Sequence, residues 1–287
     1  MISVVGGTGR LGRQVSASLV GQGVPVRVVS RHAGGSRGST DADPWLADAE
    51  LLTADVADAR QAEAAVAGAS HVVAAMTGMD PRHGAGPGAV DRDAAIVLID
   101  AAAEAGCHLV LVSVVGVAID SPIELFRMKA AAEAHLRATD MSWTIIRATA
   151  FVELWADIVT TSAGRDGRPR LLGPARSPMN FVRVGEVAAA VVRATRDDAL
   201  TGRCVSVGGP DNLSLTDFAA RATGRAPHHV PASLVRALGW GARPFAPGFA
   251  RIARQALAME HVDLTFDGGV GGGLSDGPTL DAPRPAT

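Results

Sequence analysis

The chain has 287 residues, which is enough for one large α/β domain or two ordinary ones, and its 47% hydrophobic and 20% charged residues are typical of a soluble globular protein. Its 27 basic and 29 acidic side chains leave a formal net charge of -2, which argues against a general nucleic-acid binder because phosphate neutralisation requires a basic face. The first residues include neither a basic segment nor a long apolar run, so we expect no signal peptide, no membrane anchor and a cytoplasmic location.

Short β-branched runs alternate with alanine-rich stretches of helical length through the first half of the chain. We expect strands at 2–5, 26–29, 50–53, 71–74, 109–112 and 143–146, and helices at 10–22, 60–66, 90–105 and 125–139. This alternation, with continuous apolar strands, is typical of a parallel sheet covered by helices on both faces. The sequence therefore predicts a doubly wound α/β domain over residues 1–150.

After residue 150 the pattern loosens and prolines become frequent. We expect strands at 181–184 and 204–207, and helices at 185–196, 215–223, 233–238 and 249–259. Residues 151–267 should form a smaller α+β lobe over one edge of the sheet. Residues 268–287 are rich in glycine, proline and small side chains, which bury too little apolar surface to offset the entropy of ordering, so a flexible tail is predicted.

A glycine turn follows the first strand, with glycines at positions 6, 9 and 12. In this context, between a buried strand and a helix, the spacing favours a dinucleotide site. Gly6 permits the tight turn, Gly9 lets backbone N–H groups approach a diphosphate, and Gly12 lets the helix pack closely on the sheet. The alternative is a turn without a ligand. The cofactor-binding residues predicted here are Gly6, Thr8, Gly9, Arg10, Leu11 and Gly12.

The end of the second strand indicates which cofactor binds. An NAD site would place Asp or Glu there for the ribose 2′-hydroxyl, but this chain has Arg31. A guanidinium pairs with a 2′-phosphate, which a carboxylate would repel, so NADP(H) is predicted. The alternative for Arg31 is a solvated charge at a strand end. Arg37 is a further candidate in the Gly/Ser-rich stretch that follows.

Other candidate cofactor residues follow the third and fourth strands. Asp55 and Val56 lie where the sheet edge would meet an adenine, and Asp55 could instead cap the next helix. Ala74, Ala75 and Met76 end the fourth strand, where small residues would let the chain pass beneath the cofactor.

Together, the segments VGGTGRLG (5–12), LVLVSVVG (109–116) and WTIIRAT (143–149), with Lys129 and Glu133 between the last two, resemble the NmrA-like, atypical branch of the short-chain dehydrogenase/reductase superfamily. The resemblance covers about residues 1–225. It implies an NAD(P)-binding Rossmann fold, bound NADP(H) and a substrate cleft between the two lobes. It also implies either a reductase, quinone reductases included, or a redox sensor without turnover.

The sequence departs from the superfamily pattern at its usual acid. Typical members use Tyr-x-x-x-Lys, but the residue four before Lys129 is Leu125, and the chain has no tyrosine. Lys129 is the only lysine among the 27 basic residues, which favours a specific role such as binding the cofactor ribose. The alternative is an i,i+4 surface pair with Glu133.

Two hydroxyls join Lys129 as candidate catalytic groups. Ser113 closes the fifth strand and could bond the substrate or the nicotinamide ribose, or simply end the strand; Thr149, by the resemblance, lies near the nicotinamide. Phe151, Trp155 and Phe181 could line an apolar cleft or belong to the core.

We therefore expect an NADPH-dependent reductase of a small apolar conjugated acceptor, such as a quinone or an enone. The alternative from another class is an NADPH-binding redox sensor, and a lyase or epimerase is a third possibility that the missing tyrosine disfavours. No nucleic-acid or membrane partner is expected. The cysteines Cys107 and Cys204 and the eight histidines show no metal-ligand spacing, so no metal is expected.

Overall fold

The computed structural model describes residues 1–31, 44–79, 85–242, 245–268 and 273–275. Its centre is a sheet with the strand order β13-β10-β6-β5-β4-β1-β2-β3, in which all neighbours are parallel except β13, which is antiparallel to β10. The strand order reverses beside β1, so the predicted doubly wound fold is confirmed. The strands are β1 (Ile2–Val5), β2 (Val26–Ser30), β3 (Glu50–Thr53), β4 (His71–Ala74), β5 (His108–Val114), β6 (Trp143–Ala148), β10 (Cys204–Val207) and β13 (Gly273–Ser275).

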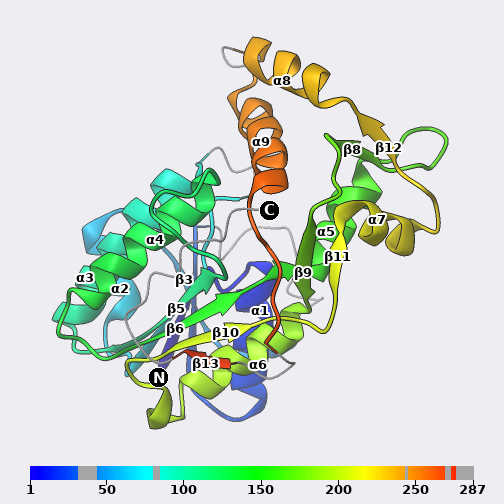
Figure 1. Cartoon of the computed structure of the whole chain (residues 1–287). Helices are drawn as coiled ribbons and strands as arrows, with labels where there is room; N and C mark the ends of the chain where they lie inside the picture. Colours follow the sequence, from blue (N-terminus) through cyan, green and yellow to red (C-terminus); the bar gives the residue numbers. More distant parts are fainter. Residues whose placement is uncertain (32–43, 80–84, 243–244, 269–272, 276–287) are drawn as a thin grey trace.

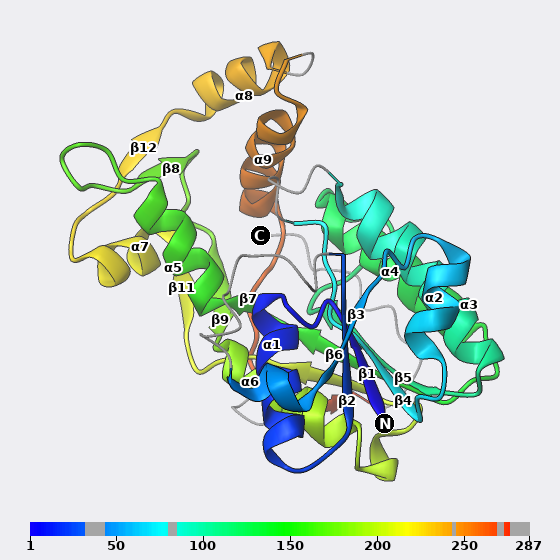
Figure 2. The same cartoon turned by 180° about the vertical axis from the view of Figure 1, so that it is seen from behind.

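Helices cover both faces of this sheet (Figure 1 and Figure 2). Helices α1 and α6 bury their apolar sides in one cluster with the sheet, and α2, α3 and α4 bury theirs in a second cluster on the other face. On β1, Val4 belongs to the first cluster and Val5 to the second, which is why this strand is apolar throughout. The helices are α1 (Arg10–Gly21), α2 (Ala59–Val66), α3 (Ala95–Glu104), α4 (Glu124–Arg137) and α6 (Val184–Ala194).

A smaller lobe stands beside the sheet and has its own core, in which Phe181 stacks on Phe218. It contains a sheet of order β11-β9-β7 and a parallel pair, β12-β8. Helix α6 and strand β10, from the segment predicted for this lobe, return to the central sheet as a crossover unit, so two stretches of chain build the lobe. Its elements are β7 (Ala150–Phe151), α5 (Val152–Thr161), β8 (Arg170–Leu172), β9 (Pro178–Val182), β11 (Asn212–Ser214), α7 (Leu215–Thr223) and β12 (His228–Val230).

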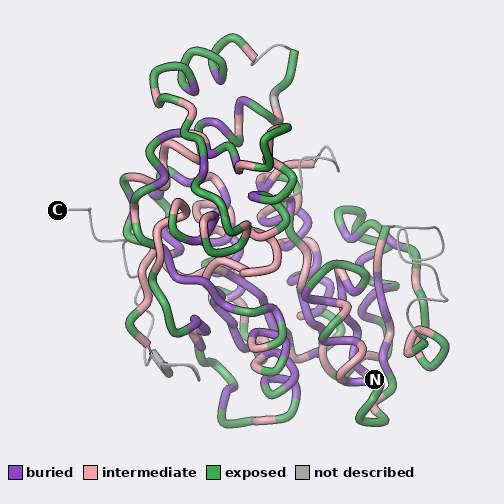
Figure 3. The backbone as a smooth tube through the Cα atoms, turned by 90° about the vertical axis from the view of Figure 1, so that its right-hand side faces the viewer, coloured by how far each residue is buried: buried purple, intermediate pink, exposed green. Residues whose placement is uncertain are grey.

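The C-terminal part of the chain passes back from this lobe to the sheet. Helices α8 (Ala232–Gly241) and α9 (Pro247–Ala258) form a hairpin in which α8 is largely exposed, whereas the interior strands of the central sheet are buried (Figure 3). The chain then reaches β13, which lies inside the segment 268–287 for which a flexible tail is predicted. Gly273–Ser275 pair with β10 through backbone groups, and this pairing does not depend on apolar side chains.

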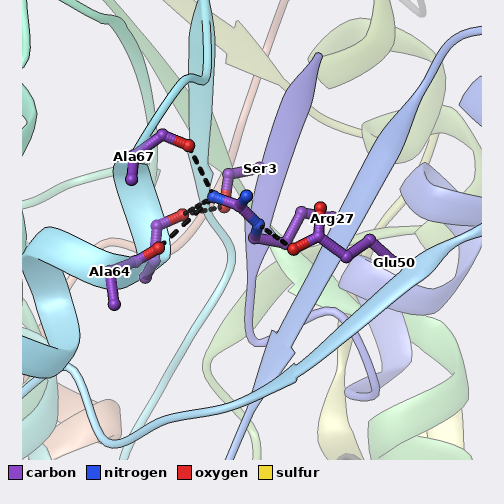
Figure 4. A network of polar contacts seen from close by, with 6 residues as sticks. Ser3, Arg27, Glu50, Ala64 and Ala67 are labelled. Carbon is purple, nitrogen blue, oxygen red and sulfur yellow. Dashed lines mark hydrogen bonds and ion pairs between the residues drawn. The ribbon is translucent and has the colours of Figure 1, made fainter.

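One polar network fixes the outer strands at the end of the sheet away from the glycine turn (Figure 4). Arg27 of β2 donates to Glu50 of β3 at 2.8 Å and to the carbonyl oxygen of Ala67, just after α2, at 2.7 Å. It also donates to two carbonyls in the last turn of α2, where the helix leaves acceptors without intrahelical partners. Ser3 of β1 donates to Ala65 in the same turn, at 2.7 Å. The network therefore ties β1, β2, β3 and α2 together.

Candidate functional site

The glycine turn joins β1 to α1 and is held by backbone hydrogen bonds. Gly6 has a φ of +79° and donates to Val29 of β2 at 2.9 Å, and Gly9 donates to Gly6 at 2.9 Å. A Cβ atom on Gly12 would lie 2.3 Å from the Gly6 oxygen, and one on Gly6 would lie 3.0 Å from the backbone nitrogen of Met76. Side chains at these two positions would therefore displace backbone, whether or not a ligand is present.

The positive end of α1 faces outward from this turn. Gly9 is the N-cap, no side chain caps the helix, and its first turn contains no acidic residue. The first N–H groups of a helix have no intrahelical acceptors, and they carry the positive end of the helix dipole. A bare helix end next to a close-packed glycine turn fits the diphosphate of a dinucleotide. The Arg10 guanidinium is paired with Asp157 of α5, so Arg10 would contribute through its backbone.

The end of β2 lies directly beside the turn. Thr8 donates to Ser30, the last residue of β2, with 2.8 Å between the two hydroxyl oxygens. Arg31 follows Ser30 in the chain and is exposed. Arg37 lies outside the described residues.

Two aspartates between β3 and α2 have different roles in the structure. The Asp55 carboxylate accepts from the Ala57 N–H, while Asp58 is the N-cap of α2 and accepts from Gln61 at 3.0 Å. The alternative that Asp55 caps this helix is therefore wrong, because the N-cap position is occupied by Asp58, three residues later. Val56 is buried.

The end of β4 lies on the other side of the turn. Ala74 is buried, and Ala75 donates to Val5 of β1 at 2.9 Å. Met76 is the residue that a Cβ atom on Gly6 would meet. These three small or unbranched residues thus pass next to the glycine turn.

Lys129 is buried between β4, β5 and an acidic residue that the sequence reasoning missed. Its ammonium donates to Val112 of β5 at 2.9 Å and to the Met76 carbonyl at 3.4 Å, and it lies 3.0 Å from the Asp91 carboxylate. The predicted alternative, a surface pair with Glu133, is wrong, because Glu133 is fully buried and binds Arg147 through two contacts of 2.7 and 3.1 Å.

The two candidate hydroxyls differ in their hydrogen bonding. Ser113 is buried, and its oxygen has no hydrogen-bond partner among the described residues. Thr149 donates to Asn180 of β9 at 2.9 Å, and Asn180 is a second residue that the sequence did not reveal. Buried polar groups are normally hydrogen-bonded, so Ser113 is the better placed of the two to bond a ligand.

The candidate aromatic residues contribute to packing. Phe181 is buried and stacked on Phe218 at 4.2 Å between ring centroids, so it belongs to the core. Phe151 and Trp155 are partly buried against the sheet and lobe clusters, respectively. No group of three or more His, Cys, Asp or Glu residues that could hold a metal occurs among the residues described.

A doubly wound sheet, a glycine turn and a bare helix end at the strand-order reversal define a dinucleotide-binding α/β protein of the Rossmann type. A family model described as NAD(P)H-binding matches residues 6–198, so the chain belongs to that family. The family confirms the NAD(P)-binding part of the predicted resemblance, and the solved structures below share the fold. NAD(P)(H) is therefore the class of cofactor.

Two curated proteins are similar in sequence. A chloroplastic divinyl chlorophyllide a 8-vinyl-reductase from Oryza sativa subsp. indica is 28% identical over 259 residues, which cover 83% of this chain and 63% of the rice protein. An NAD(P)H azoreductase from Xenophilus azovorans is 26% identical over 241 residues, which cover 83% of this chain and 79% of the azoreductase. The chain thus spans less than two thirds of the rice protein.

Solved structures share the fold. A nucleoside-diphosphate-sugar epimerase from Staphylococcus aureus superposes with a TM-score of 0.69 at 15% identity, covering 90% of this chain and 89% of that chain. An NADPH-dependent quinone oxidoreductase from Escherichia coli, complexed with NADPH, superposes with a TM-score of 0.64 at 18% identity, covering 90% of each chain. In the described part of this chain, no helix has the length and apolar character needed to cross a membrane.

Proposed function

We propose that the protein is an NADPH-dependent oxidoreductase that reduces a small apolar conjugated acceptor, such as a quinone or an enone, without a catalytic tyrosine. The similar proteins named as an azoreductase, a vinyl-reductase and a quinone oxidoreductase support this class of acceptor. The observation that carries the proposal is the Ser113 hydroxyl, buried at the end of β5 and without a hydrogen-bond partner among the described residues.

Each part of the site has a role in this proposal. The N–H groups at the start of α1 hold the diphosphate, and exposed Arg31 pairs with the 2′-phosphate. Bound NADPH supplies the hydride. Ser113 hydrogen-bonds the oxygen of the acceptor on which negative charge develops, and the proton that completes the reduction comes from Ser113 or from water. Thr149 is a weaker donor candidate, because its proton is directed to Asn180.

A second candidate function is a redox sensor that binds NADPH without turnover. One observation favours it: the Lys129 ammonium already has three acceptors within the protein, so it is less available to a substrate. The reductase and the sensor can be distinguished by an assay. The protein is mixed with NADPH and a panel of quinones, enones and azo compounds, and NADPH oxidation is followed by absorbance at 340 nm. Turnover supports the reductase, and tight NADPH binding without turnover across the panel supports the sensor.

Cofactor choice is tested with Arg31→Ala. Loss of the guanidinium should weaken NADPH binding at least about tenfold, since charge-assisted hydrogen bonds to a phosphate contribute roughly 1.5–3 kcal/mol, and should change NADH binding less than about twofold. Titration calorimetry with both cofactors measures this. Arg60→Ala, an exposed arginine on α2, is the matched control and should change neither affinity. Equal losses of NADPH and NADH in Arg31→Ala would refute the role in 2′-phosphate binding.

A further inference from the structure

Asp91 and Lys129 form a buried ion pair at the edge of the sheet that bears the glycine turn. The side chains are 0% and 7% exposed, and their charged atoms are 3.0 Å apart. Asp91 belongs to the π-helical turn Gly88–Ala94 that leads into α3. Such turns occur often at functional sites. A buried charge without its partner is strongly unfavourable, so each of the two side chains fixes the other.

The Asp91 carboxylate also holds the loop that follows β4. Its second oxygen accepts from the Gly78 N–H at 2.8 Å and from the Thr77 hydroxyl at 3.4 Å. The oxygen that faces Lys129 has no other polar partner among the described residues, so the ammonium at 3.0 Å is what compensates its charge. One side chain thus positions both the lysine and the loop.

The position of this pair in the fold places it on the nicotinamide side of the proposed cofactor. The diphosphate lies at the turn after β1, and Arg31 assigns the adenosine half to the β2 side. The other half must then extend over β4 and β5. Lys129 bonds the carbonyls of Met76, after β4, and of Val112, in β5. This step rests on the proposed function.

The charge of the nicotinamide ring changes in the reaction. The oxidised ring carries a positive charge and the reduced ring is neutral, so a buried ammonium without its counter-charge would disfavour the oxidised ring alone. We propose that Asp91 is a positioning residue that neutralises Lys129 and thereby sets the relative affinities for NADP⁺ and NADPH.

The test compares the Kd values for NADP⁺ and NADPH, measured by calorimetry, in the wild type, Asp91→Asn, Lys129→Gln and the double variant. Asp91→Asn should weaken NADP⁺ at least about tenfold more than NADPH, the scale expected for a unit charge a few ångströms away at an effective dielectric constant of about 20. Lys129→Gln should shift the ratio in the opposite direction, because the carboxylate remains. The double variant should restore the wild-type ratio.

Controls separate charge from structure. Glu63→Gln, which removes an exposed carboxylate on α2, should leave the ratio unchanged, and the melting temperature of each variant reports folding. If Asp91→Asn does not fold, the proposal is tested by Lys129→Gln alone, in which the ratio of the NADP⁺ and NADPH Kd values should shift in favour of NADP⁺. Equal changes for both cofactors in every folded variant would overturn the proposal and leave the proposed function intact. A wild-type protein that binds neither cofactor would instead overturn the proposed function.

Discussion

Gly12 is the residue at which the glycine turn leaves least space. A Cβ atom there would lie 2.3 Å from the Gly6 oxygen and 2.8 Å from the Gly7 Cα, all of it backbone that cannot move without opening the turn. A Cβ atom on Gly21, at the other end of the same helix, would meet nothing within 4 Å. Comparing alanine substitutions at Gly12 and Gly21 therefore distinguishes a steric requirement for glycine from the general effect of glycine in a helix.

Replacing Gly12 by alanine should lower the free energy of unfolding by about 1–3 kcal/mol, the usual cost of overpacking, and should weaken NADPH binding because the N-terminus of α1 shifts. Gly21→Ala should leave both within about 1 kcal/mol of wild type. Urea denaturation and calorimetry measure the two quantities. A Gly12→Ala protein as stable as Gly21→Ala would contradict the close contact between turn and helix.

At the scale of the elements, the neighbouring strands β4 and β5 each begin with a histidine. His71 and His108 are directly opposite in the register, with ring centroids 5.2 Å apart. Burial lowers the pKa of both imidazoles from 6.5, and the proximity of His71 lowers the pKa of His108 further. Because the folded chain binds protons less readily than the unfolded chain, protonation favours unfolding.

The free energy of unfolding should therefore fall as the pH drops below about 6.5, while above that pH these groups contribute no pH dependence. Urea denaturation between pH 7.5 and pH 5 measures the slope. In His71→Gln/His108→Gln the decline should be smaller. His261→Gln, an exposed histidine, should show the wild-type slope. An unchanged slope in the double variant would show that other groups cause the decline.

For the whole molecule, Asn180 joins the lobe to the sheet. Asn180 is 1% exposed, and its side-chain oxygen accepts from Thr149, just after β6, and from the Gly209 N–H, which follows β10. Its amide donates to the Gly209 carbonyl and to Asn212 of β11. The amide group of Asn180 therefore connects the segments that follow β6 and β10 of the central sheet to the lobe.

Asn180→Ala should lower the free energy of unfolding by about 3 kcal/mol, since several buried groups lose their partners and each such loss costs about 1–3 kcal/mol. Asn212→Ala, at an exposed position that shares part of the network, should cost about 1 kcal/mol or less. Urea denaturation compares the two. Equal effects would mean that Asn180 is not the main connection between the lobe and the sheet.

Local sequence determined the fold class and predicted the half of the candidate site that is formed by the glycine turn and Arg31. The strands of the first half are continuous apolar runs, which are stable only when buried on both faces, and the glycines and Arg31 are fixed by their distance along the chain from β1 and β2. Strands of two or three residues, such as β7 and β12, have too few positions to show a period, and β13 depends on an edge strand far away in the sequence.

Only the tertiary structure decided the partners of the buried polar groups. Lys129 and Thr149 stood out as residue types, but their partners Asp91 and Asn180 come from separate elements and have no local pattern that marks them. A polar group inside a protein must find whichever partner the packing of distant elements brings within about 3 Å. Periodicity therefore predicts which residues are buried, and the three-dimensional packing determines which of them meet.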